Sequence, residues 1–175
     1  MIDASAYGKA LYELAVEEGK SEQIAAELRL IDSAVEQGYV NLMDSPAVSK
    51  EEKCDLLRSA FGKADQLLQN FLFILCEKRA FYRFSACVAA YFSAKDEAEN
   101  ILRATAITAL PMEQRQIDAL RRKLSELTGK QVILETQIDA DLIGGIRLRY
   151  EGVQLDGSLR SRLDTLRRSL ADAIV

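Results

Sequence analysis

A change of hydrophobic period near residue 103 constrains the fold of this chain more than any other sequence feature. Before it, apolar residues such as Ile24, Leu28 and Ile31 recur every three to four positions, as on one face of an α-helix. After it, short segments alternate apolar and polar residues, as β-strands do. We therefore expect a mainly α protein, in which residues 1–103 form an N-terminal bundle of about six helices and residues 104–175 form a small α+β domain.

Start and stop signals divide the first part into helices. The first helix is predicted from about Asp3 to Glu18, and the second is capped by Ser21 and ends near Gly38. The segment YVNLMDSP is expected to contain about one turn of helix. The sequence SKEE, which begins at Ser49, is a capping box for the helix that follows. Two more helices are predicted in ADQLLQNFLFILCEKR and FYRFSACVAAYFSAKDEAENI.

The second part is predicted to have the element order β-α-β-β-β-α, a small sheet with two helices against it. Strands are expected in RATAITAL, QVILETQI, GIRLRYE and VQLD, with one helix over residues 113–128 and a final helix that begins at Ser158. Turn residues occupy the connections around the last two strands, where glycine tolerates a positive φ angle. This structural motif comprises Gly144, Gly145, Gly152, Asp156, Gly157 and Ser158.

The glycines of LIGGIRLRYEGVQLDGS are not arranged as a phosphate-binding loop. Such a loop leads from a strand into the N-terminus of a helix, whereas Gly144 and Gly145 lead into a strand. Asp156 precedes the final helix but would repel a phosphate. No nucleotide site is therefore expected.

Composition excludes several other classes of site. The chain has no histidine, which removes the commonest general base and metal ligand, and we expect no catalytic set, cofactor or metal. A formal net charge of −4 argues against nucleic acid as a partner. The three cysteines lie in apolar helical segments and are expected to be reduced, buried thiols. The absence of a targeting segment or a long apolar run predicts a protein that remains in the compartment where it is made.

Two predicted helices, the first and the one containing FLFILC, are apolar on more sides than a surface helix needs. One interpretation is that such a helix lies at the centre of the bundle. The other is that the two helices form a groove that accepts an amphipathic helix from another protein. The sequence alone leaves both open.

The final helix carries arginines beside its leucine stripe: Arg160, Arg162, Arg167 and Arg168. They form either a solvated face, with Arg160 pairing to Asp164 one turn later, or a docking face for an acidic partner.

Taken together, the segments LIGGIRLRYEGVQLDGSLRSRLDTL and YGKALYELA resemble the delta subunit family of the F-type ATP synthase, the bacterial counterparts of the oligomycin-sensitivity-conferring protein. The resemblance covers essentially the whole chain. One departure is Gly8, where the family usually has alanine; glycine within a helix costs about 1 kcal/mol relative to alanine.

The resemblance implies a non-catalytic peripheral-stalk subunit at the cytoplasmic face of the cell membrane, associated with the membrane only through the complex. The helical part would bind the N-terminal helix of an alpha subunit, and the second part would bind the C-terminal end of the b-type stalk subunits through the hairpin and the four arginines. The expected groove residues are Tyr7, Ala10, Leu11, Leu14, Leu68, Phe71, Leu72 and Leu75. Leu11→Asp is expected to abolish peptide binding while the bundle stays helical. One alternative is a helical adaptor of another cytosolic assembly. The other is an enzyme that uses carboxylates or a Ser/Lys pair, which agrees less well with the composition.

Overall fold

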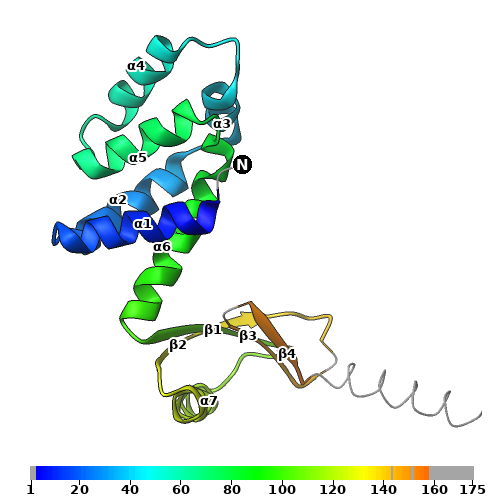
Figure 1. Ribbon diagram of the computed structural model, residues 1–175. Helices are drawn as coiled ribbons and strands as arrows, with labels where there is room; N and C mark the ends of the chain where they lie inside the picture. Colours follow the sequence, from blue (N-terminus) through cyan, green and yellow to red (C-terminus); the bar gives the residue numbers. More distant parts are fainter. Residues whose placement is uncertain (1–2, 143, 151, 158–175) are drawn as a thin grey trace, which may run out of the picture. The chain divides into compact units, whose positions relative to one another are not determined.

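A computed structural model describes residues 3–142, 144–150 and 152–157 of the chain (Figure 1). The chain is mostly helical and has one small four-stranded sheet. It divides into two compact units, Met1–Lys95 and Asp96–Val175. The division falls a few residues before the first strand, which begins at Ile101.

The helices are α1 (Ala4–Glu17), α2 (Ser21–Ala34), α3 (Gln37–Asp44), α4 (Lys50–Phe61), α5 (Gln66–Glu77), a short 3-10 helix η1 (Phe81–Arg83) and α6 (Phe84–Ala98). Capping side chains explain two of these boundaries, whereas Ser21, predicted as a cap, is the first residue of α2, whose N-cap is Lys20. Ser49 and Glu52 form the expected capping box at the start of α4, which ends at Gly62. Asp3 caps α1, since its carboxylate accepts a hydrogen bond from the Ser5 backbone N–H at 3.0 Å.

The second and third helices differ from the prediction. Helix α2 ends at Ala34 rather than near Gly38, and α3 is an eight-residue helix that contains Gly38. The glycine was interpreted as a stop signal, but glycine only lowers helix propensity and does not forbid a helix. The chain turns at Val35 and Glu36, whose backbone is extended. Met43 anchors α3, because its side chain is fully buried in the core of the helical unit.

One hydrophobic core holds the six helices together. Its largest fully buried side chains come from α2, α3, α5, η1 and α6, and they include Ile24, Leu68, Phe81, Phe84 and Tyr91. Phe81 stacks on Phe84, and the Tyr91 hydroxyl donates a hydrogen bond to the Ser21 carbonyl oxygen at 2.8 Å. Burial of such side chains, at roughly 1.5–3 kcal/mol each, is the main source of stability for this unit.

Helix α1 approaches α6 unusually closely at Gly8. A β-carbon built on Gly8 would lie 2.3 Å from the Cys87 carbonyl oxygen and 2.6 Å from the Ala90 β-carbon. No side chain fits there without moving one helix away from the other. The departure from the family pattern at this position therefore has a packing reason, which outweighs the loss of helix propensity.

The second unit contains a sheet with the strand order β2-β1-β3-β4. Its strands are β1 (Ile101–Thr108), β2 (Gln131–Ile138), β3 (Ile146–Tyr150) and β4 (Val153–Asp156), and α7 (Gln114–Thr128) connects β1 to β2. Strands β1 and β2 run parallel, which requires a crossover, while β1–β3 and β3–β4 are antiparallel. All four predicted strands and the helix between the first two are confirmed, with their ends shifted by at most two residues. The predicted final helix lies outside the described residues.

The two faces of the sheet differ in character. One face packs against α7 and includes Leu102, Ala104, Val132 and Leu148, which cluster with Leu124 of the helix. The opposite face carries Arg147 and Arg149, as the alternation predicted, but it is mixed, because the buried Ile107 pairs with Arg147 and shares this face. None of the helices in the described part of the chain has the length and apolar character that crossing a membrane requires.

Candidate partner-binding surfaces

Helix α1 presents a buried face and an exposed apolar edge. Its buried residues are Ala4, Gly8, Leu11 and Ala15. Among the four groove residues predicted on this helix, Leu11 is only 3% exposed and belongs to the core, while Tyr7 is half-buried against it. Ala10 is exposed, and Leu14 is 46% exposed. The accessible part of the predicted wall on α1 therefore consists of Tyr7, Ala10 and Leu14.

The residues predicted on α5 are all internal. Leu68, Phe71, Leu72 and Leu75 are buried in the core of the helical unit. The exposed apolar residue of this helix is Ile74, and Leu67 and Phe73 are partly buried. Of the two interpretations of FLFILC, the burial favours a central helix, because four of its six side chains point into the core.

The predicted effect of Leu11→Asp needs correction. Leu11 and Leu14 cannot be distinguished by pattern, since both are apolar positions of one helix about a turn apart. The structure separates them, because Leu11 faces the core and Leu14 faces solvent. A charge at Leu11 is therefore a test of folding, and a charge at Leu14 is a test of binding.

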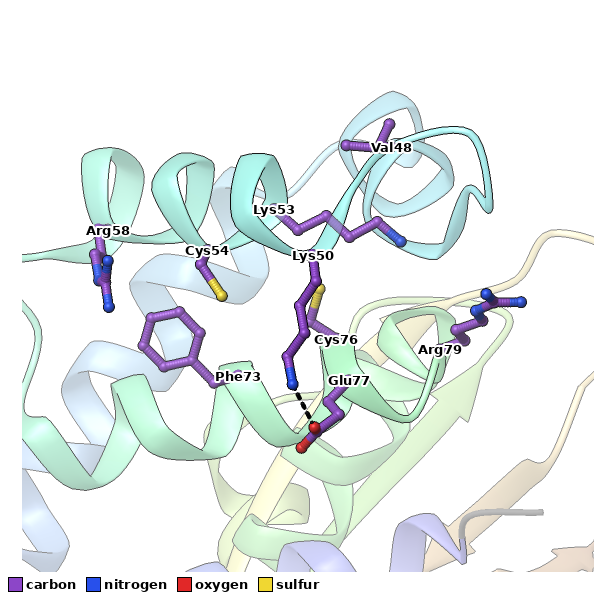
Figure 2. A pocket seen from close by; sticks show the side chains of 9 residues that line it. All are labelled: Val48, Lys50, Lys53, Cys54, Arg58, Phe73, Cys76, Glu77 and Arg79. Carbon is purple, nitrogen blue, oxygen red and sulfur yellow. Dashed lines mark hydrogen bonds and ion pairs between the residues drawn. The ribbon is translucent and has the colours of Figure 1, made fainter.

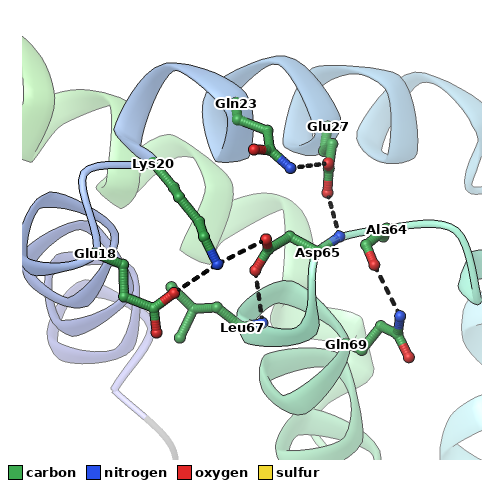
Figure 3. Close-up of polar contacts among 8 residues, drawn as sticks. All are labelled: Glu18, Lys20, Gln23, Glu27, Ala64, Asp65, Leu67 and Gln69. Carbon is green, nitrogen blue, oxygen red and sulfur yellow. Dashed lines mark hydrogen bonds and ion pairs between the residues drawn. The ribbon is translucent and has the colours of Figure 1, made fainter.

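A polar network fixes the start of α5 relative to the turn between α1 and α2 (Figure 3). The Lys20 ammonium bonds to the Glu18 carboxylate at 2.8 Å and to the Asp65 carboxylate at 3.0 Å. The Asp65 backbone N–H donates to the Glu27 carboxylate at 2.8 Å, and the Asp65 carboxylate accepts from the Leu67 backbone N–H at 2.9 Å. The Leu67 N–H and the Lys20 ammonium hold the pKa of the Asp65 carboxyl below its ordinary value. This network stabilises the relative placement of α1 and α5.

The hairpin of the second unit has the glycine geometry that the motif predicted. Gly144, Gly145 and Gly152 have φ angles of 156°, 87° and 76°. Gly152 lies in the connection between β3 and β4, where a positive φ lets the two strands pair without a longer loop. Gly157 ends the hairpin, and its backbone N–H donates to the Ile146 carbonyl oxygen at 2.9 Å.

Strand β4 carries exposed apolar side chains at the edge of the sheet. Val153 and Leu155 pair with Tyr150 and Leu148 and so lie on the same face as the core, yet both are about half exposed. The carboxylate of Asp156 lies 3.5 Å from the Arg147 guanidinium on the opposite face. Ser158 and the predicted contact residues Arg160, Arg162, Arg167 and Arg168 lie outside the described residues.

The described residues offer little for catalysis. They contain no group of three or more cysteine, aspartate or glutamate side chains that could hold a metal ion. All three cysteines are free; Cys76 and Cys87 are buried as predicted, whereas Cys54, also predicted to be buried, is partly exposed. Burial raises the pKa of the Cys76 and Cys87 thiols, which disfavours the nucleophilic thiolate.

Two structural roles were missed from the sequence. Gly8 was interpreted only as a weak helix position, although the small residues of SACVAA in α6 could have indicated a close helix crossing. Lys53 was not singled out from the sequence, yet its side chain is buried. The signal at Lys53 was absent, because a charged residue on a helix is exposed by default.

Comparisons with known proteins agree on one family, and the matches cover nearly the full length of the chain. The family described as "ATP synthase delta (OSCP) subunit" matches residues 4–170. "ATP synthase subunit delta" of Alkaliphilus oremlandii (strain OhILAs) is 33% identical over 172 residues, which cover 97% of this chain and 96% of the relative. The protein of that name from Clostridioides difficile (strain 630) is 31% identical over 175 residues, covering 98% and 97%. A chain in the structure of the Toxoplasma gondii mitochondrial ATP synthase hexamer has the same fold, with a TM-score of 0.72, 22% identity and 98% of both chains covered.

Proposed function

Because the chain belongs to the ATP synthase delta (OSCP) subunit family, we propose that it links the top of the catalytic head of the synthase to the b-type subunits of the stalk. It is a component of the peripheral stalk and is structural rather than catalytic. The link holds the head still while the central rotor turns during ATP synthesis.

The observation that carries this proposal is the presence of two compact units in one chain, each with exposed apolar surface. Helix α1 exposes Leu14 and Val16 in the first unit, and β4 exposes Val153 and Leu155 in the second. Separate surfaces on separate units suit a protein that contacts two partners at once.

In the first unit, the N-terminal helix of an alpha subunit binds over α1 and α5. Tyr7, Ala10 and Leu14 contact its apolar face, and Ile74 contributes from α5. The other five predicted groove residues are buried and support the contact residues from the core: Leu11, Leu68, Phe71, Leu72 and Leu75. An amphipathic helix suits this surface, because side chains at i, i+3 and i+7 of α1 already present a matching apolar row.

In the second unit, the C-terminal end of the b-type subunits contacts the β3–β4 hairpin and the segment after it. Val153 and Leu155 supply apolar contact. The outer edge of β4 presents backbone N–H and C=O groups that do not pair with another strand of the described sheet. The four arginines of residues 160–168 pair with acidic side chains of the stalk. In this arrangement the protein is peripheral at the cytoplasmic face of the cell membrane and reaches the membrane only through the complex.

The proposed alpha-subunit site is tested by calorimetric titration with a synthetic peptide of the alpha-subunit N-terminus from the same organism. Wild type is expected to bind one peptide, and Leu14→Asp is expected to weaken binding by about tenfold or more, since a carboxylate replaces an apolar contact at the interface. Leu30→Asp on α2 is the matched control, because Leu30 is 69% exposed and lies outside the proposed surface.

Circular dichroism should show unchanged helix content in both variants. If Leu14→Asp and wild type bind the peptide with equal affinity, the site does not lie on α1. If wild type does not bind the peptide, the proposed contact with the alpha subunit is wrong.

A further inference from the structure

A pocket of about 460 Å³ opens between α4 and α5, away from the residues proposed to bind the alpha subunit (Figure 2). Its volume lies within the range of small-molecule sites. Cationic side chains dominate its lining, and Val48, Phe73 and the two thiols provide apolar surface. The two thiols are those of Cys54 and Cys76.

Four cations line this pocket, and one carboxylate accompanies them. The Lys50 ammonium lies 2.6 Å from the Glu77 carboxylate, so these two charges neutralise each other across the two helices (Figure 2). The Arg58 guanidinium lies over the Phe73 ring at 5.8 Å and 3.8 Å from the exposed carboxylate of Asp55. Such an exposed pair is weak and leaves most of the Arg58 charge available. The pocket is therefore positive in a unit that holds more acidic than basic residues overall.

Lys53 is the most informative of these residues. It is only 6% exposed, and its side chain runs along the pocket toward the end at which Arg79 lies (Figure 2). No carboxylate within the described residues forms an ion pair with it. The Asp44 carboxylate is already engaged, since it accepts hydrogen bonds from the backbone N–H groups of Phe81 and Tyr82. The Lys53 ammonium therefore remains available to pair with a bound anion.

Arg79 provides a second, independent observation. Its φ angle is 51°, in the left-handed region that glycine normally occupies at the end of a helix. The surrounding bonds are those of a tight helix end, with the Ala80 N–H donating to the Leu75 carbonyl oxygen at 2.9 Å. A non-glycine residue in this conformation is strained, because its β-carbon approaches the following carbonyl oxygen. The negative end of the helix dipole at the C-terminus of α5 favours a cation nearby, and Lys78 already meets that preference. The dipole does not explain why a second cation, Arg79, occupies the strained position.

We propose that the α4–α5 pocket binds a small organic oxyanion with more than one negative charge. Lys53 and Arg79 bind the charged groups, and Val48 and Phe73 contact the carbon skeleton. Charge-assisted bonds to two cations, one on α4 and one in the turn after α5, give both affinity and orientation. Polycarboxylates and organic phosphates share this chemistry, and separate probes distinguish them.

The test is calorimetric titration of the full chain with citrate and, separately, with glycerol 3-phosphate, at constant ionic strength. Wild type is expected to bind one of these probes saturably with one-to-one stoichiometry. Lys53→Met and Arg79→Gly are each expected to weaken that binding by about tenfold or more, because each removes a charge-assisted bond. Lys78→Gln is the matched control, since it removes the same charge from the adjacent position, which does not line the pocket.

Thermal unfolding separates lost binding from lost folding. Arg79→Gly relieves the left-handed strain and is expected to raise the melting temperature while it weakens binding. A wild type that binds neither probe, or variants that bind as tightly as wild type, would overturn the proposal. Equally weakened binding in Lys78→Gln would also overturn the proposal, because the loss would then follow from the lower net positive charge of the protein and not from the pocket.

Discussion

Leu11→Asp is expected to unfold the helical unit, or to lower its free energy of unfolding by most of its value. Leu11 is 3% exposed within the core, so the substitution removes a buried leucine and places a carboxylate among apolar side chains. Truncation of a buried leucine alone costs about 2–5 kcal/mol, and an unpaired buried charge adds to that cost. The total stability of a typical domain is only about 5–15 kcal/mol.

Urea denaturation followed by circular dichroism measures this effect. Leu14→Asp is the matched control, because it places the same charge one turn along the same helix, at a position that is 46% exposed. Its midpoint is expected to shift little. A Leu11→Asp variant that unfolds at the wild-type urea concentration would show that α1 does not pack as described.

Gly8→Ala is expected to lower the free energy of unfolding by about 2 kcal/mol, the reverse of the usual effect in a helix. Helix propensity alone would favour alanine by about 1 kcal/mol. At this position the new β-carbon would lie 2.3 Å from the Cys87 carbonyl oxygen and 2.8 Å from the Tyr91 backbone nitrogen. Because both are backbone atoms of α6, the helices must separate, and overpacking of this kind costs about 1–3 kcal/mol or more.

Gly38→Ala in α3 is the matched control for this effect. A β-carbon on Gly38 would meet no atom within 4 Å, so this variant is expected to gain up to about 1 kcal/mol of stability. Thermal or chemical unfolding of the two variants should therefore give shifts of opposite sign. Stabilisation by both substitutions would contradict the close crossing of α1 and α6.

Local sequence signals predicted most of the elements of this fold. The Ser49–Glu52 capping box and the alternating residues of QVILETQI depend on neighbours in the chain, and the structure confirms both. The helix over Gln37–Asp44 was underestimated, because Met43 stabilises it through a distant core rather than through local propensity. The parallel pairing of β1 with β2 likewise depends on how the chain returns after α7, which periodicity does not encode.

The candidate sites were predicted less completely than the fold. Apolar positions on α1 and α5 were recognised, but which of them face the core depends on the other helices. Leu11 and Leu14 look alike in sequence, yet only Leu14 is exposed. The basic pocket was not predicted at all, since Lys53 and Arg79 lie 26 positions apart and meet only because α4 packs against α5. Family membership, by contrast, was recognisable from the two quoted motifs.

Simultaneous binding of both partners tests the proposed link most directly. The measurement is a calorimetric titration of the full chain with a soluble C-terminal fragment of the b-type subunits, performed with and without a saturating alpha-subunit N-terminal peptide. The two proposed surfaces lie on different units, so the fragment is expected to bind with the same stoichiometry in both titrations and a ternary complex should form. Displacement of one ligand by the other, or failure of the fragment to bind at all, would contradict the link between head and stalk.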